Sequence, residues 1–160
     1  MAQQGDYLSV TLTITGGKVR SEITCPVSTI LDLKQRINTL LGIYVPRQTL
    51  YCNGQEMQSD LQLKDYNVQP SSEVGLAVEP YYGDEQFPIQ VVDRAAEATY
   101  FVNVKETMKV GCLKQKVQRR SHHGKCTTLT QLEVVMQGSF PLNAYYVNDR
   151  SVIEVKVEPR

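Results

Sequence analysis

The order of the apolar patterns along this chain occurs twice, and such a repeat constrains the fold more than any other feature of the sequence. Each half opens with two runs in which apolar and polar residues alternate, continues with a short stretch of helical spacing, and ends with further alternating runs. The last runs even finish alike, with Ala-Val-Glu-Pro at 77–80 and Lys-Val-Glu-Pro at 156–159. The chain of 160 residues is therefore predicted to hold two similar domains.

Strand patterns open the first half. One run alternates apolar with polar residues, and its apolar members are Leu8, Val10, Leu12 and Ile14. Alternation of this kind is typical of a strand that buries one face. Gly16-Gly17 predicts a turn, because glycine reaches positive φ at little cost, and a returning strand is expected over 19–25. Further strands are expected at 50–52, closed by the turn pair Asn53-Gly54, and at 73–78.

A helix is expected between these strands. Thr29 is a good N-cap residue, and Gly42 stands where a helix usually ends. Between them, apolar residues recur at helical spacing and are predicted to face the core. They are Ile30, Leu33, Ile37, Leu40 and Leu41.

The second half repeats this plan less regularly. Strands are expected at 89–92, 100–104, 132–136 and 152–157, with a turn over 93–97. The apolar stripe of the expected helix consists of Val110, Leu113 and Val117.

The segment between the halves is rich in turn-forming residues. Pro80 has no N–H group and ends the preceding strand ladder, and Gly83 and Pro88 follow. We therefore place the domains at residues 1–79 and 87–160 and a short, stiff linker at 80–86.

Charge and cysteine content exclude some classes of function. The 17 basic and 17 acidic residues cancel, which argues against a polybasic nucleic-acid binder. The balance is uneven along the chain, with 6 basic and 8 acidic residues in 1–80 but 11 basic and 9 acidic residues in 81–160. No apolar run of about 18 residues predicts a membrane span, and the N-terminal residues lack the pattern of a signal peptide. Four cysteines without a Cys-x-x-Cys pair are typical of reduced thiols, so a cytoplasmic or nuclear location is expected.

The motifs of both halves resemble those of the ubiquitin family. In the first half the matching segments are Ile30-x-x-Leu-Lys-x-x-Ile37, Gly42-Ile43, Gln48-x-Leu50, Asn53-Gly54-Gln55-Glu56-Met57 and Leu63-Lys-Asp-Tyr-Asn-Val68. The last of these resembles a family turn whose tyrosine closes a loop by hydrogen bonding. In the second half the matching segments are Val110-x-x-Leu-Lys-x-x-Val117, Leu132-x-Val-Val-Met-Gln-Gly138 and Ser151-Val-Ile-Glu-Val-Lys-Val157. Between Gly138 and Leu142 the second half is expected to lack about five residues of the family loop.

Two such domains with a short linker resemble the interferon-induced tandem ubiquitin-like modifiers. The resemblance implies an α+β fold of two ubiquitin-like β-grasp domains in tandem, and a role in innate immunity. It also implies a non-enzymatic protein, without cofactor or metal, that is attached to target proteins or bound by them. The expected partners are activating and conjugating enzymes, deconjugating proteases or receptors, and the chain itself is expected to be a monomer without a membrane partner. The alternative is a non-conjugated tandem adaptor, or a fragment of a longer protein, that docks partner proteins.

The C-terminal tail departs from the family pattern. Ubiquitin-type modifiers end in Arg-Gly-Gly, and Arg160 stands where that arginine is expected. The two glycines do not follow it, so either the sequence stops short of the native tail or the protein is not conjugated.

The family's apolar recognition patch is also altered. The resemblance places Tyr51 and Val135 at the position of the patch's isoleucine in the two halves. Gly75 and Glu154 take the position of its histidine, and Ala77 and Lys156 that of its valine. These six residues are the candidate protein-binding positions, and receptors of ubiquitin itself are expected to bind them poorly.

The sequence gives weak support for a metal site or a reactive thiol. His122-His123 lie near Cys112 and Cys126, but the spacing fits no standard zinc site and favours a solvated basic loop. Cys112 in the first helical turn and Cys126 beside Lys125 are either thiols of lowered pKa or ordinary reduced cysteines. No Gly-x-Ser-x-Gly, Walker or His-Glu-x-x-His motif predicts an enzyme.

Basic residues cluster around the second helix. They are Lys105, Lys109, Lys114, Lys116, Arg119, Arg120 and Lys125. No aromatic residues alternate with them, so stacking on nucleic-acid bases is not indicated. The cluster is either a solvated helix face or a docking patch for an acidic partner or RNA.

Overall fold

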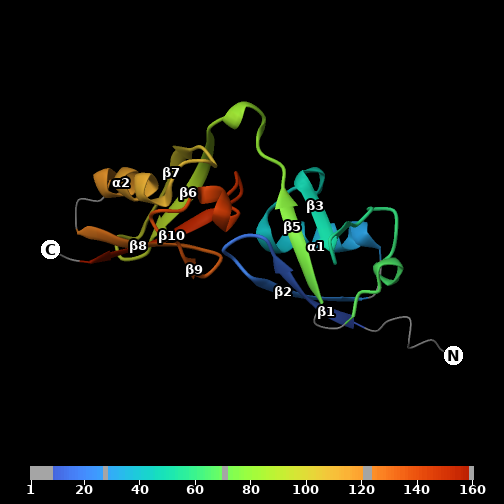
Figure 1. Ribbon diagram of the computed structural model, residues 1–160. Helices are drawn as coiled ribbons and strands as arrows, with labels where there is room; N and C mark the ends of the chain where they lie inside the picture. Colours follow the sequence, from blue (N-terminus) through green and yellow to red (C-terminus); the bar gives the residue numbers. More distant parts are fainter. Residues whose placement is uncertain (1–8, 27–28, 70–71, 121–123, 159–160) are drawn as a thin grey trace. The chain divides into compact units, whose positions relative to one another are not determined.

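The described part of the protein, whose structure is a computed structural model, contains two mixed five-stranded sheets, each with one α-helix (Figure 1). The structure describes residues 9–26, 29–69, 72–120 and 124–158. The chain divides into a first unit, Met1–Glu79, drawn from blue to green, and a second unit, Pro80–Arg160, drawn from yellow-green to red. Within the described part, no helix is both long and apolar enough to span a bilayer.

The first unit has the sheet order β2-β1-β5-β3-β4. Its elements are β1 (Ser9–Thr15), β2 (Ser21–Pro26), α1 (Ile30–Leu41), the 3₁₀ helix η2 (Val45–Arg47), β3 (Gln48–Cys52), β4 (Gln55–Glu56), η3 (Leu63–Tyr66) and β5 (Glu73–Val78). The two central strands, β1 and β5, run parallel, and the other neighbours are antiparallel.

The second unit has the order β7-β6-β10-β8-β9, with β6 and β10 parallel in its centre. Its elements are η4 (Tyr82–Asp84), β6 (Phe87–Asp93), β7 (Ala98–Val104), α2 (Val110–Arg120), β8 (Lys125–Gln131), β9 (Val134–Val135), η5 (Leu142–Tyr145) and β10 (Val152–Glu158). Strand for strand this is the topology of the first unit. The predicted α+β tandem of two β-grasp sheets is therefore confirmed.

Most residues of the first unit for which the sequence predicts a cap or a turn form that structure. The Oγ1 atom of Thr29 accepts a hydrogen bond from the Asp32 N–H at 3.2 Å and caps α1. Gly42 ends the helix in the left-handed conformation, with φ of 76°. The predicted loop-closing tyrosine is Tyr66, whose hydroxyl oxygen accepts from the Gln58 N–H at 2.7 Å. Leu40 was expected in the core, but its side chain is 44% exposed.

The turn after β1 requires glycine at its first position. Gly16 has a φ of 120°, and a Cβ atom there would lie 2.4 Å from the backbone oxygen of Leu76 on β5. No side chain fits this approach, so any substitution would push the two central strands apart. The run that precedes this turn is strand β1 as predicted, although Leu8 lies outside the described residues and the side chain of Val10 is not described.

Hydrogen bonds set the correspondence between the units. Leu50 of β3 and Leu129 of β8 each accept a 2.8 Å bond, from the Met57 and Met136 N–H groups. Tyr145 corresponds to Tyr66, since its hydroxyl accepts from the Gln137 N–H at 2.9 Å. Both interiors are therefore built from the same positions. The fully buried helix residues are Ile30, Leu33 and Ile37 in α1 and Val110, Leu113 and Val117 in α2.

Only part of the predicted strand at 132–136 is a strand, because β9 covers Val134–Val135 alone. Strand β8 ends at Gln131, and Leu132 and Glu133 form a tight turn with φ values of 51° and 64°. This turn takes the place of Asn53-Gly54 in the first unit. The prediction of a shortened loop is wrong for the same reason, because Leu142 follows Met136 by six positions, as Leu63 follows Met57.

The segment at 80–86 is attached to the second unit. The Tyr81 N–H donates to Oε1 of the buried Glu106 at 2.6 Å, and the Tyr81 hydroxyl donates to Asp149 at 3.1 Å. The Tyr81 ring also packs against Phe87, with centroids 4.9 Å apart. Asp84 accepts from the Thr107 hydroxyl at 2.6 Å. Tyr81 and Asp84 therefore form part of the second unit's surface.

Candidate protein-binding surfaces

In the first unit, the predicted contact residues lie on the sheet face away from α1. Side chains alternate along strands β3 and β5, so Leu50 and Leu76 point inward while Tyr51 and Ala77 point outward. Tyr51 pairs across the strands with Gly75, which has no side chain to cover the ring. The Tyr51 side chain is 39% exposed. An exposed aromatic ring bordered by small residues can anchor a protein interface.

In the second unit, the register changes one of the predicted positions. Glu154 and Lys156 pair with Thr130 and Thr128, as Gly75 and Ala77 pair with Tyr51 and Thr49. Thr130 is therefore the counterpart of Tyr51. The prediction that Val135 holds that position is wrong, because the turn at 132–133 puts Val135 on β9, across from Thr130.

This face of the second unit carries an ion pair and several exposed apolar side chains. The Nη2 atom of Arg94 lies 2.6 Å from Oε1 of Glu154, in an ion pair at the exposed surface. Val135 is 55% exposed and Phe101 is 63% exposed. Val152 is also exposed, and it lies beyond Gln90 in the same cross-strand row as Phe101.

Phe101 and Val152 were not among the predicted contact residues. A signal for Phe101 was present, because alternation with the inward-facing Tyr100, Val102 and Val104 puts it on the opposite face. Val152 lies in a predicted strand, but the sequence analysis does not predict on which face of the sheet its side chain lies.

Two of the clustered cations of α2 interact with their own unit. Lys116 donates from Nζ to the backbone oxygen of Asn103 on β7 at 3.1 Å. The Arg120 guanidinium lies 5.1 Å from the ring centroid of Tyr100. Burial raises the pKa of Tyr100, the negative charge of Asp93 raises it further, and Arg120 lowers it. These contacts leave fewer cations of α2 for an external anion.

The cysteines give no support for a reactive site. Burial raises the pKa of the Cys126 thiol, which favours the ordinary reduced cysteine over a thiol of lowered pKa. Cys112 is exposed in the first turn of α2. Among the described residues, no three His, Cys, Asp or Glu side chains gather as metal ligands would. His122, His123 and the predicted tail residue Arg160 lie outside the described residues.

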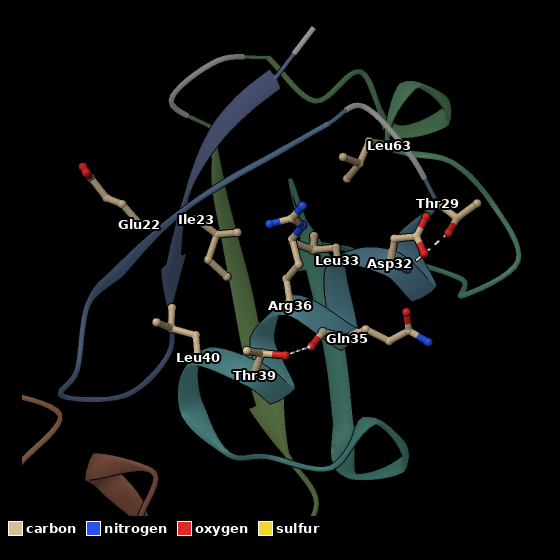
Figure 2. A pocket seen from close by; sticks show the side chains of 10 residues that line it. All are labelled: Glu22, Ile23, Thr29, Asp32, Leu33, Gln35, Arg36, Thr39, Leu40 and Leu63. Atoms are coloured by element: carbon tan, nitrogen blue, oxygen red, sulfur yellow. Dashed lines mark hydrogen bonds between the residues drawn. The ribbon is translucent and has the colours of Figure 1, made fainter. Parts of the chain in front are cut away.

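A groove of about 710 Å³ opens between β2 and α1 of the first unit (Figure 2). Its apolar lining comes from Ile23 of β2, from Leu33 and Leu40 of α1, and from Leu63. Arg36 also lines the groove, and Figure 2 shows its guanidinium pointing from α1 toward the space between helix and strand. The remaining lining residues are Glu22, Thr29, Asp32, Gln35 and Thr39.

Comparison with known proteins agrees with the sheet topology. The sequence profile of the ubiquitin family matches residues 13–81, which covers most of the first unit. A ubiquitin-like domain is present. The second unit has the same sheet order and the same helix position, so the chain has the ubiquitin-like fold twice.

Several solved structures are similar to part of the chain. One is an N-terminal ubiquitin-like domain in solution, at 15% identity and a TM-score of 0.47, over 52% of this chain and 88% of that one. A ubiquitin-like domain from Arabidopsis thaliana has 19% identity and a TM-score of 0.44, over 48% and 84%. The crystal structure of ATBAG1 in complex with HSP70 has 26% identity and a TM-score of 0.42, over 44% and 41%.

Proposed function

We propose that the protein is a ubiquitin-like modifier that is attached to target proteins or bound by them. The observation that carries this proposal is the ubiquitin-like domain at 13–81, whose sheet presents an exposed Tyr51 between small residues. Partner proteins supply the catalysis, and this chain supplies rigid surfaces for recognition. A cytoplasmic or nuclear location, where modifier enzymes and reduced thiols occur together, is part of the proposal.

Conjugation would use the terminal carboxylate. An activating enzyme joins this carboxylate to AMP from ATP and releases pyrophosphate. A cysteine thiolate of the enzyme then displaces AMP to form a thioester, and a lysine amine of the target displaces the thiol to form an amide. Glycine at the reacting end allows close approach in a narrow channel, because it has no side chain. Conjugation therefore needs a Gly-Gly pair after Arg160.

The test compares two forms of the full chain, one ending at Arg160 and one extended by Gly-Gly. Each is incubated with ATP in lysate of cells that express the protein naturally, and reducible thioester adducts are measured. We expect adducts with the extended form and none with the shorter form. If the extended form stays uncharged while ubiquitin is charged in the same lysate, the conjugation proposal fails.

The alternative is a tandem adaptor, or part of a longer protein, that binds partners without being conjugated. The exposed Phe101, Val135 and Val152 on the second sheet favour it, since exposed apolar groups on a rigid sheet suit non-covalent docking. A chain that is never charged but still forms specific complexes, weakened by Phe101→Ser, would support the adaptor.

Kinship with the interferon-induced modifiers is a finer part of the proposal. It is supported by the tandem arrangement and the short connecting segment. Measurement of the transcript before and after interferon treatment of the source cells tests it, and an unchanged level would contradict it.

A further inference from the structure

The residues on and beside α2 carry a concentrated positive charge. From Lys105 to Gln131 the sequence holds seven basic residues and one acidic residue, Glu106. The Glu106 side chain is buried and accepts a hydrogen bond from the Tyr81 N–H, so its carboxylate does not lie among the exposed cations. We call the seven basic residues the α2 cluster: Lys105, Lys109, Lys114, Lys116, Arg119, Arg120 and Lys125.

No described carboxylate neutralises the α2 cluster. The ion pairs among the described residues do not include any of its seven members. Lys116 donates to a backbone carbonyl and Arg120 lies over an aromatic ring, and both of these partners are uncharged. Such contacts position the two side chains but leave their positive charges uncompensated.

Some members of the cluster stand where they destabilise the helix. Lys116 and Arg120 are four positions apart, and like charges at this spacing repel each other. Lys109 precedes the first turn of α2, where the helix dipole favours negative charge, and that turn contains no acidic residue. The first turn of α1, in contrast, contains Asp32. The stability of the second unit therefore does not explain the cluster, and a bound anion would relieve the repulsion.

The helix of the first unit is less basic at the same positions. The two helices correspond through their buried residues, so Arg119 and Arg120 stand where α1 has Thr39 and Leu40. The cluster is thus a property of the second unit and not of the β-grasp fold.

The exposed side of α2, whose residues are all described, lacks the apolar centre of a typical protein interface. Its exposed residues are Cys112, Gln115, Arg119 and Arg120. The exposed apolar side chains of the second sheet, among them Phe101, lie on the face away from α2. Protein interfaces are built around apolar and aromatic anchors, whereas the phosphate backbone of nucleic acids is bound mainly by Lys and Arg. The cluster therefore fits a nucleic acid better than an acidic protein.

The surroundings of α2 favour a duplex over a single strand. Proteins that bind single strands stack the bases on exposed aromatic rings. Among the described residues beside the cluster, the Tyr100 ring is the nearest candidate, and the Arg120 guanidinium covers it. A duplex offers its phosphates without any need for base stacking.

The cations lie on both flanks of α2. Lys116 and Arg120 contact β7, whereas Lys114 lies on the side of β8, where its charge acts on the Cys126 thiol. Cations on two flanks of one helix can contact two rows of phosphates at once. In an RNA duplex the major groove is deep and narrow, which brings the phosphates of the two strands close together, whereas that of DNA is about 12 Å wide. The arrangement therefore favours RNA.

We propose that the α2 cluster binds double-stranded RNA. Its exposed cations contact phosphates on both sides of the narrow groove, while Lys116 and Arg120 keep their contacts with β7 and add positive charge. Contacts of this kind read the backbone and not the base edges, so binding is independent of base sequence. The inference goes beyond the proposed function, and it holds whether or not the chain is conjugated.

The test is an NMR titration of the ¹⁵N-labelled full chain with an RNA duplex of about 16 base pairs. We expect amide shifts concentrated in 105–120 and 125–131, with a dissociation constant of about 10⁻⁶–10⁻⁴ M at physiological salt. The logarithm of the association constant should fall with the logarithm of the salt concentration at a slope of about −3, which corresponds to about three phosphate contacts. No binding at low salt, or shifts centred on Tyr51 or Phe101, would overturn the proposal.

Three further ligands identify the occupant. They are the same RNA as a single strand, a DNA duplex of the same sequence, and a poly-glutamate peptide of equal charge. We expect each of them to bind more weakly than the RNA duplex. A peptide that binds at least as tightly would identify an acidic protein as the partner and overturn the proposal. A single strand or a DNA duplex that binds at least as tightly would overturn the choice of double-stranded RNA.

Matched variants separate the cluster from the net charge of the chain. Lys109→Gln with Arg119→Gln removes two exposed cations whose side chains bond to no other described residue. This variant should bind the duplex about tenfold more weakly and reduce the magnitude of the salt slope by about 2. Arg36→Gln with Lys64→Gln makes the same charge change in the first unit and should leave binding unchanged.

Circular dichroism checks that both variants keep the fold of the natural sequence. Lys105→Gln lies outside the helix and gives an independent reading, with a reduction of the salt slope by about 1. Equal losses of affinity in the first-unit and second-unit variants would show that net charge decides binding, and the proposal would fail.

Discussion

The two units have matching interiors and different edges. In both, a tyrosine hydroxyl closes the loop before the 3₁₀ turn, and the same three helix positions are buried. At the edge strand, however, Arg36 bonds to no other residue that the structure describes, whereas Lys116 bonds to the backbone of β7. The β-grasp topology fixes which positions fill the core, but it leaves the residues of the edge strand and of the helix surface free to differ. We therefore expect binding by these units to depend on edge and face residues more than on the fold.

The outer sheet faces differ in a similar way. The first unit presents Tyr51 beside Gly75 and Ala77, and the second has Thr130 at the position of Tyr51. Its exposed apolar groups lie elsewhere on the face, at Phe101, Val135 and Val152. The two faces are therefore expected to bind different partners.

Substitutions that create a cavity in either core should have the largest effect on the free energy of unfolding. Leu33 and Leu113 are fully buried at matching helix positions, so Leu33→Ala and Leu113→Ala should each cost about 2–5 kcal/mol. Urea unfolding of the full chain, followed through NMR signals of each unit, measures the loss. We expect each substitution to destabilise its own unit.

The control for this pair is Leu31→Ala, a change of the same kind at an exposed position of α1. It should alter the unfolding free energy by less than about 0.5 kcal/mol. Leucine substitutions with clearly unequal costs at Leu33 and Leu113 would show that the two interiors are not equivalent.

Removal of the loop-closing tyrosine hydroxyls should have a smaller effect on the free energy of unfolding. Tyr66→Phe and Tyr145→Phe each take the acceptor from one backbone N–H and should cost about 0.5–1.5 kcal/mol. Amide exchange at Gln58 and Gln137 should rise in the respective variant. If the hydroxyl removal lowers the stability of one unit and not of the other, the two loops are not equivalent.

Alkaline pH should have the smallest effect on stability, and this effect should be confined to the second unit. Burial raises the pKa of Cys126 above its ordinary value of 9.0 and that of Tyr100 above 10.0. A raised pKa means that the folded state holds the proton more tightly than the unfolded state does. The contribution of these two groups to the stability of the second unit is therefore complete below those ordinary values. It falls as the pH rises through the folded pKa values.

Denaturant unfolding at about pH 8 and about pH 10.5 checks this expectation through signals of the second unit. The variant carrying Tyr100→Phe and Cys126→Ala should lose less stability between the two pH values than the natural sequence. An equal loss in both would assign the pH dependence to other groups.

Much of the fold could be predicted because strong local signals coincide with the tertiary structure. Thr29, Gly42 and the Asn53-Gly54 turn each form the structure expected from their residue types. The turn at Leu132 and Glu133 could not be predicted, since neither residue is typical of positive φ. The apolar Val134-Val135-Met136 run that follows favours a strand. With that strand in the register of β3, Val135 would lie in the binding patch.

The candidate sites were less predictable than the fold. Tyr51 could be found because it lies within a well-matched strand. The cations of α2 that contact their own unit could not, because the spacing of cations along a helix does not show which strand lies next to it. The same holds for Cys126, for which the sequence left a lowered pKa and an ordinary reduced cysteine both open, while burial in the structure raises the pKa.

Exchange of two helix residues between the units tests the central claim most directly. The full chain carrying Arg119→Thr, Arg120→Leu, Thr39→Arg and Leu40→Arg trades these residues between α2 and α1 and keeps the same net charge. It should also keep its circular dichroism spectrum. Titration with the RNA duplex should then give weaker amide shifts in α2 and new shifts in α1, where the natural sequence is expected to show none. If the variant is folded and still binds RNA only at α2 with unchanged affinity, surface residues do not decide binding and the account is wrong.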